Sequence, residues 1–142
     1  MILYSTNHQS PDVSLEEAVF RGLPPDNGLY MPHLIPHLPA SFFENIDKML
    51  ITDIAFEVSK ALLSDDISEE DLRMIVERAI NFDAPVVEIE ENTYVLELFH
   101  GPSMAFKDFG ARFMASLMSY FLQKSQKDIR SEEHTSELQS HL

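Results

Sequence analysis

The order of elements between residues 93 and 122 constrains the fold most. Residues 93–99 read TYVLELF and predict a strand, whereas residues 105–122 place apolar side chains at helical spacing. Between them, residues 100–103 predict a tight turn that ends in Ser103, a residue type suited to cap a helix. Such a unit aims backbone N–H groups and the positive end of a helix at one point, which favours an anion there.

Upstream of this unit, the sequence predicts short strands and helices. Residues 2–5 have the composition of a strand, and Ser14 with Glu17 forms a capping box that opens a helix. Gly22 is expected to end that helix. Residues 22–39 contain five of the eight prolines, so we expect an extended, turn-rich connection there.

Two further helices are expected before the second half of the chain. Asp53 is predicted to cap the first of them. Its expected buried side chains are Ile54, Val58, Ala61 and Leu62. Ser68 and Asp71 form a second capping box. The apolar residues that follow it are Leu72, Ile75, Val76 and Ala79. Residues 86–89 predict one more strand, joined to residues 93–99 by a turn.

We therefore expect an α/β chain in two parts. Residues 1–87 would form a small N-terminal domain, mostly helical with a few strands, and residues 88–129 would supply the first strand and helix of an incomplete second domain. Without the rest of that domain, the apolar face of the last helix would be exposed and the chain would self-associate. That face consists of Phe106, Phe109, Phe113, Leu117 and Phe121.

Charge and composition exclude several classes of partner. The chain has 24 acidic against 10 basic residues and a net charge of -14, which argues against binding nucleic acid or an anionic membrane. Cysteine is absent, so no disulfide or thiolate site is expected. The N-terminus lacks the pattern of a signal peptide and no apolar run approaches 18 residues. These features favour a cytoplasmic protein.

The last thirteen residues, 130–142, do not continue the pattern before them. The run RSEEHTSELQS from Arg130 to Ser140 resembles the translation of a widely used sequencing-library adapter. We expect residues 130–142 to be an assembly artefact and the natural protein to be cut short there. The alternative, a natural acidic tail, would be expected to show a charge run or low complexity.

Lys107 falls in the first turn of the predicted helix, where a cation is unfavourable. One interpretation is a nucleophilic amine, because a helix N-terminus and partial desolvation favour the neutral form that attacks an aldehyde. The other is a surface lysine that extends into solvent, and the local pattern alone favours it. His33 and His37 are a weak metal candidate, because the intervening Pro36 forbids a helix that would bring them to one face.

Residues 96–110, LELFHGPSMAFKDFG, resemble the pyridoxal-phosphate attachment segment of threonine synthases, LELFHGPTLAFKDFG. Only Ser103 and Met104 differ. Residues 22–32, GLPPDNGLYMP, are similar to the early family segment GLAPDGGLYVP, with Asn27 in place of a glycine. The start, Tyr4-Ser5-Thr6, also resembles the family, whereas Asn7 stands where many members have arginine.

The resemblance implies a pyridoxal 5'-phosphate enzyme of fold type II, in the tryptophan synthase β-like group. Such an enzyme converts O-phospho-L-homoserine and water to L-threonine and phosphate. Lys107 would form the Schiff base with the cofactor and act as acid and base. His100 at the predicted strand end is expected to line the site, and Ser103 either caps the helix or donates to a ligand.

The family's glycine-rich loop, which holds the cofactor phosphate, lies downstream of the lysine. This chain has four glycines and no such loop, so we expect the 142 residues alone to lack threonine synthase activity. Two alternatives stay open: another fold type II enzyme, such as a serine or threonine dehydratase, or a non-enzymatic helical binding module.

Overall fold

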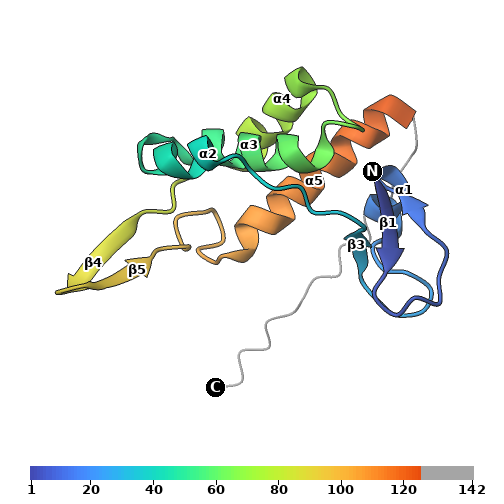
Figure 1. Cartoon of the computed structure of the whole chain (residues 1–142), viewed down its shortest axis with the longest axis horizontal. Coiled ribbons are helices and arrows are strands. Elements are labelled where there is room, and N and C mark those ends of the chain that lie inside the picture. The colour runs from blue at the N-terminus through green and yellow to red at the C-terminus, as the bar shows by residue number, and fades with distance from the viewer. Residues whose placement is uncertain (126–142) are drawn as a thin grey trace.

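The computed structural model describes residues 1–125, which form a mixed α/β fold (Figure 1). A small sheet and helix α1 lie at one end of the long helix α5, and the hairpin of β4 and β5 projects at the other end. Helix α4 packs along α5, and α3 packs against α4. The expected α/β class is confirmed. No helix among these residues is long and apolar enough to cross a membrane.

The sheet has three antiparallel strands in the order β2-β1-β3. β1 (Ile2–Ser5) was predicted, and it pairs with β2 (Val13–Ser14) and β3 (Tyr30–Pro32). β3 lies within the proline-rich connection, where no strand was expected. It is an edge strand, a position that tolerates a proline because one side of the strand needs no N–H.

Helix α1 (Leu15–Arg21) begins and ends as predicted. The Ser14 side chain accepts a hydrogen bond from the Glu17 backbone N–H, and Gly22 follows the helix with a φ of 75°. That left-handed φ suits glycine, which has no Cβ to clash. The connection passes through Asn27, whose φ of 61° is left-handed, a conformation that asparagine tolerates. It then leads to α2 (Ala40–Asn45) and a short 3-10 helix, η1 (Ile46–Lys48).

Helix α3 (Ile51–Leu63) differs from the prediction in its start and its buried face. Leu50 stands at the N-cap position, and Asp53 lies in the first turn, where it accepts a hydrogen bond from Arg73 at 2.8 Å. Val58, predicted as buried, is 37% exposed. The face that packs inward is formed instead by Phe56, Ser59 and Leu63. Arg73 of α4 also stacks on the Phe56 ring, 3.8 Å from the ring centroid, so this face of α3 contacts α4.

Helix α4 (Glu69–Ala79) confirms the prediction. Ser68 caps it by accepting from the Asp71 backbone N–H. Its buried residues are Leu72, Ile75, Val76 and Ala79. Leu72 and Val76 are almost completely buried and lie at the centre of the core, which also receives side chains from β1, α1, α3 and α5.

The hairpin of β4 (Val86–Glu90) and β5 (Thr93–Leu96) turns at Asn92, which has a φ of 59°. The predicted turn is confirmed, but the second strand ends at Leu96, three residues earlier than expected. Every residue of both strands is exposed, and within residues 1–125 neither strand pairs with another element.

Helix α5 (Lys107–Ser125) packs against α4 and α1. Leu117 and Phe121 are buried in the shared core, so the expectation that its whole apolar face would be exposed is wrong. Phe109 is half-buried with its ring centroid 4.7 Å from that of Phe82, and only Phe106, at 72%, is largely exposed among the five aromatic and leucine residues of that face. Helices α1 and α4 therefore cover part of the apolar face of α5.

Candidate cofactor-binding site

Lys107 is the first residue of α5, so its predicted place in the first helical turn is confirmed. Its side chain is exposed, and no hydrogen bond or ion pair within residues 1–125 engages its amine. The partial desolvation that the sequence argument invoked is not provided by the described residues. The amine is therefore accessible to a reactant from solvent.

Ser103 does not cap α5, contrary to the prediction, because the helix begins four residues later. Its backbone N–H instead donates to Asp108 Oδ2 at 2.7 Å. The chain between them folds as a turn closed by a hydrogen bond from the Met104 N–H to the Gly101 carbonyl at 3.0 Å. Met104 has a φ of 53°, a conformation that is uncommon for a residue with a side chain.

Asp108 is only 7% exposed although it is charged and adjoins an exposed lysine. Burial by itself would raise the pKa of this carboxyl group. The hydroxyl and N–H of Ser103, followed by the positive charges of Lys107 and Arg112, outweigh that effect and hold the pKa below its usual value. The carboxylate is therefore ionised at neutral pH and bonded to the turn before the helix.

His100 lies in the loop between β5 and the turn. Its Nε2 atom is 2.7 Å from Glu97 Oε2, and its ring stacks on Phe99 with centroids 4.8 Å apart. His100, Ser103 and Lys107 thus belong to one continuous surface segment, but within the described residues no hydrogen bond joins His100 or Ser103 to Lys107. The histidine has an acidic partner that would orient the ring.

Arg112 holds the first half of α5 against the end of α4. Its Nε donates to the Ala79 carbonyl at 2.8 Å, and its Nη2 donates to the Arg78 carbonyl and to Asn81 Oδ1, both at 3.0 Å. A guanidinium is well suited to this task because its planar donors can satisfy several helix-terminal oxygens together. Sequence reasoning did not identify this residue.

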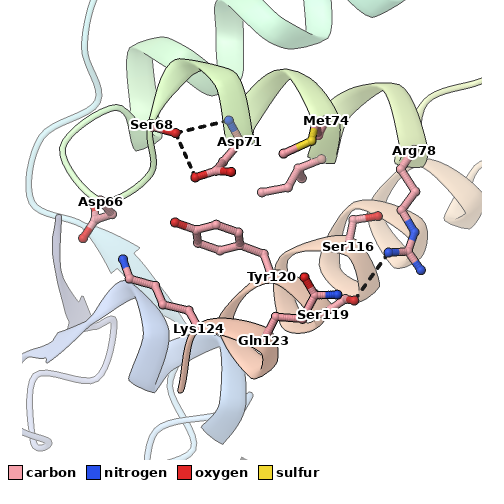
Figure 2. A pocket seen from close by; sticks show the side chains of 11 residues that line it. Asp66, Ser68, Asp71, Met74, Arg78, Ser116, Ser119, Tyr120, Gln123 and Lys124 are labelled. Carbon is pink, nitrogen blue, oxygen red and sulfur yellow. Dashed lines mark hydrogen bonds between the residues drawn. The ribbon is translucent and has the colours of Figure 1, made fainter. Parts of the chain in front are cut away.

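A cavity of about 770 Å³ lies between α4 and the C-terminal half of α5 (Figure 2). Its wall includes Ser68 and Asp71, which bond to each other, and Arg78, which reaches Ser119 at 3.4 Å. Lys107 is not among the lining residues, nor are His100 and Ser103. The cavity is therefore separate from the candidate site.

The weak metal candidate at His33 and His37 has a simpler explanation. His33 Nε2 lies 2.6 Å from Asp12 Oδ2, and its ring packs beside Tyr4. Among residues 1–125 there is no group of three or more histidine, aspartate or glutamate side chains arranged to hold a metal ion.

Comparison with known proteins identifies the family. A family model described as the threonine synthase N terminus matches residues 3–80. Threonine synthase of Haemophilus influenzae is 39% identical over 122 residues, which are 84% of this chain and 28% of that protein. Threonine synthase of Escherichia coli is 40% identical over 123 residues, with the same two coverages.

Solved structures agree with the sequence matches. The crystal structure of threonine synthase from Escherichia coli matches with a TM-score of 0.78 at 37% identity, over 84% of this chain and 28% of that one. The pyridoxal-phosphate-bound threonine synthase from Brucella melitensis matches with a TM-score of 0.82 at 30% identity, over 89% of this chain and 28% of that one.

The matches define the class of this chain: it has the mixed α/β fold of the amino-terminal region of the proteins named above. It belongs to the threonine synthase family, corresponds to the N-terminal region of those proteins, and spans about 28% of the length of the relatives named above.

Proposed function

We propose that the protein to which these residues belong converts O-phospho-L-homoserine and water to L-threonine and phosphate, with Lys107 as the lysine that holds pyridoxal 5'-phosphate. The single observation that carries the lysine assignment is its position. Within a threonine synthase chain, Lys107 opens a 19-residue helix directly after a tight turn, and its amine is exposed and unengaged by residues 1–125. A relative of matching fold is described as bound to the same cofactor.

The residues present fit part of the cofactor. The free amine of Lys107 can bond covalently to an aldehyde, and the helix N-terminus beside it favours a bound anion. The chain has only four glycines, at 22, 28, 101 and 110, and they form no glycine-rich cradle for a phosphate group. The described residues therefore account for the covalent attachment of the cofactor and not for its phosphate.

In the proposed reaction, the bound cofactor supplies an electron sink for negative charge on the substrate carbons. Lys107 would move the protons: its Nζ atom would take one proton each from the α- and β-carbons of the substrate. As phosphate leaves the γ-carbon, that carbon would receive a proton, water would add its hydroxyl to the β-carbon, and Lys107 would return a proton to the α-carbon. His100 is proposed to line the substrate side, with Glu97 orienting its ring through the 2.7 Å contact. The 142 residues alone are proposed to be inactive, because the remaining contacts to cofactor and substrate are missing.

The lysine assignment can be tested on the chain as it stands. Pyridoxal 5'-phosphate is added, the lysine bond is made permanent with borohydride, and the modified residue is located by mass spectrometry. We expect preferential modification of Lys107 and a visible absorbance band that Lys107→Ala removes. Lys124→Ala is the matched control, because Lys124 is also exposed and lies on the same helix. Equal modification of both lysines would contradict the assignment.

The alternatives make different predictions. A dehydratase-like enzyme would share the lysine modification, but the gene from which the chain derives would not restore growth without threonine to a strain that lacks threonine synthase. A helical binding module would show no lysine preference. A cytoplasmic location, which the sequence favours, is also proposed here.

We also propose that the isolated chain self-associates, with the hairpin as the contact surface in place of α5. Six apolar side chains of β4 and β5 are between 38% and 64% exposed. They are Val86, Val87, Ile89, Tyr94, Val95 and Leu96. Exposed strands with free edges pair with other chains. Sedimentation at rising concentration should show oligomers that Ile89→Lys reduces, whereas Leu34→Lys, at a 78% exposed position in the proline-rich connection, should not.

A further inference from the structure

Asp108 is held more tightly than a residue at the start of an exposed helix requires. An aspartate in the first helical turn already interacts favourably with the helix dipole while its side chain is in solvent. Here the carboxylate is buried, and it accepts a hydrogen bond from the backbone N–H of Ser103 at 2.7 Å. The dipole does not explain this burial or this contact.

Gly101 closes the other side of the same carboxylate. A Cβ atom added to this buried glycine would lie 2.8 Å from Asp108 Cβ and 2.9 Å from its Cγ, distances at which side-chain atoms clash. The glycine therefore leaves the space that the aspartate side chain occupies, and a side chain at position 101 would require movement of Asp108. We refer to Gly101, Ser103 and Asp108 as the Asp108 clamp.

The clamp encloses a turn that needs support. Met104 has a φ of 53° and a side chain that is 77% exposed, so packing of that side chain does not hold its backbone in the left-handed region. The hydrogen bond from the Met104 N–H to the Gly101 carbonyl closes the turn, and the bond from the Ser103 N–H to Asp108 ties the turn to α5. Lys107 follows Met104 by three residues.

We infer that Asp108 is a positioning residue, whose carboxylate fixes the turn of residues 101–104 against α5 and thereby sets the direction from which Lys107 meets its ligand. The consequence for Lys107 rests on the proposed function. The fixed turn does not, because it follows from the contacts of the clamp alone. Asp108 itself is not proposed to touch the reacting atoms.

The effect on Lys107 is measured by reaction with pyridoxal 5'-phosphate and borohydride in the 142-residue chain. The readout is the ratio of modification at Lys107 to that at Lys124 in the same molecule. Asp108→Ala and Gly101→Ala should each lower this ratio about tenfold, the loss expected when hydrogen bonds to a charged acceptor disappear. The modification ratio of Asp108→Asn should lie between those of the unaltered chain and Asp108→Ala, because an amide oxygen still accepts a hydrogen bond from the Ser103 N–H.

Gly110→Ala is the matched control, because no atom outside its own helix lies within 4 Å of the added Cβ, and the ratio should stay as in the unaltered chain. Hydrogen exchange at the Ser103 amide gives the second measurement. Its exchange should accelerate about tenfold in Asp108→Ala while the amides of α4 keep their protection, which shows that the chain stays folded.

The two measurements separate failure of the inference from failure of the proposed function. Equal modification of Lys107 and Lys124 in the unaltered chain would reject Lys107 as the cofactor lysine, and the Ser103 amide would still decide whether the clamp exists. Unchanged exchange at Ser103 in Asp108→Ala overturns the inference. So does an unchanged modification ratio in both Asp108→Ala and Gly101→Ala when the unaltered chain prefers Lys107.

Discussion

Removing the Arg112 guanidinium should separate the start of α5 from the end of α4. In Arg112→Ala, the carbonyls of Arg78 and Ala79 and the side chain of Asn81 all lose the donor that they share. Ala79 is completely buried, so water cannot easily replace the donor at its carbonyl. Helix α4 also loses the positive charge that Arg112 places at its C-terminal end, where such a charge is favourable.

The expected cost follows from these contacts. A buried carbonyl left without a partner costs about 1–3 kcal/mol, and a cation near a helix C-terminus contributes about 0.3–1 kcal/mol. The contacts to the exposed Arg78 and Asn81 are replaced largely by water. We therefore expect Arg112→Ala to lower the free energy of unfolding by about 2–3 kcal/mol. Arg112→Lys should keep only part of this stabilisation, because an ammonium retains the positive charge but lacks the planar group that reaches three oxygens.

Urea unfolding of the 142-residue chain, followed by circular dichroism, measures the change as a shift in midpoint at constant slope. Arg21→Ala is the control, because Arg21 forms an exposed pair with Glu17 within α1, and loss of such a pair costs about 0.3–0.5 kcal/mol. The reasoning is refuted if Arg112→Ala destabilises the chain no more than Arg21→Ala does.

Two further changes test the N-terminal region. Burial opposes the charge of Asp26, but hydrogen bonds from Ser5 and from the N–H groups of Gly28 and Gln9 lower its pKa from 3.8 to about 2. The contribution of the Asp26 carboxylate to stability is therefore complete above pH 3.8 and is lost as the pH falls through about 2. Urea titrations should show the stability difference between the unaltered chain and Asp26→Asn shrinking over that interval, and a difference independent of pH would contradict this. Leu72→Ala should lower the free energy of unfolding by about 2–5 kcal/mol in the same assay, because Leu72 is 1% exposed. Met74→Ala, at a 57% exposed position, should lower it by less than about 0.5 kcal/mol. Similar losses of stability in the two variants would contradict the assigned core.

Local signals predicted the elements whose causes are local. Ser14 and Ser68 both cap helices as expected, because a capping box acts within one turn of the chain. The hairpin turn at Asn92 was predicted for the same reason. These features depend on neighbouring residues and need no knowledge of the tertiary structure.

Features that depend on distant contacts were not predicted correctly. Helix α3 offers two overlapping apolar faces, and its contact with α4, which includes the stacking of Arg73 on Phe56, buries Phe56 and leaves Val58 exposed. β3 exists because β1 offers it a pairing edge, although its own sequence includes Pro32 and indicated a loop. In both cases the deciding partner lies more than fifteen residues away in the sequence.

The candidate site combines both kinds of information. The sequence segment predicted Lys107 and its place at the start of a helix, whereas Asp108 was interpreted only as a favourable charge in a first turn. Its contact with Gly101 depends on the left-handed φ of Met104, which folds the intervening residues back onto the helix. The spacing of residues in the sequence does not indicate that Gly101 and Asp108 lie side by side, because a helix capped at Ser103 would hold them apart. The sequence predicted that Ser103 would cap the helix, whereas in the structure its N–H binds Asp108. This contact fixes the turn that precedes Lys107.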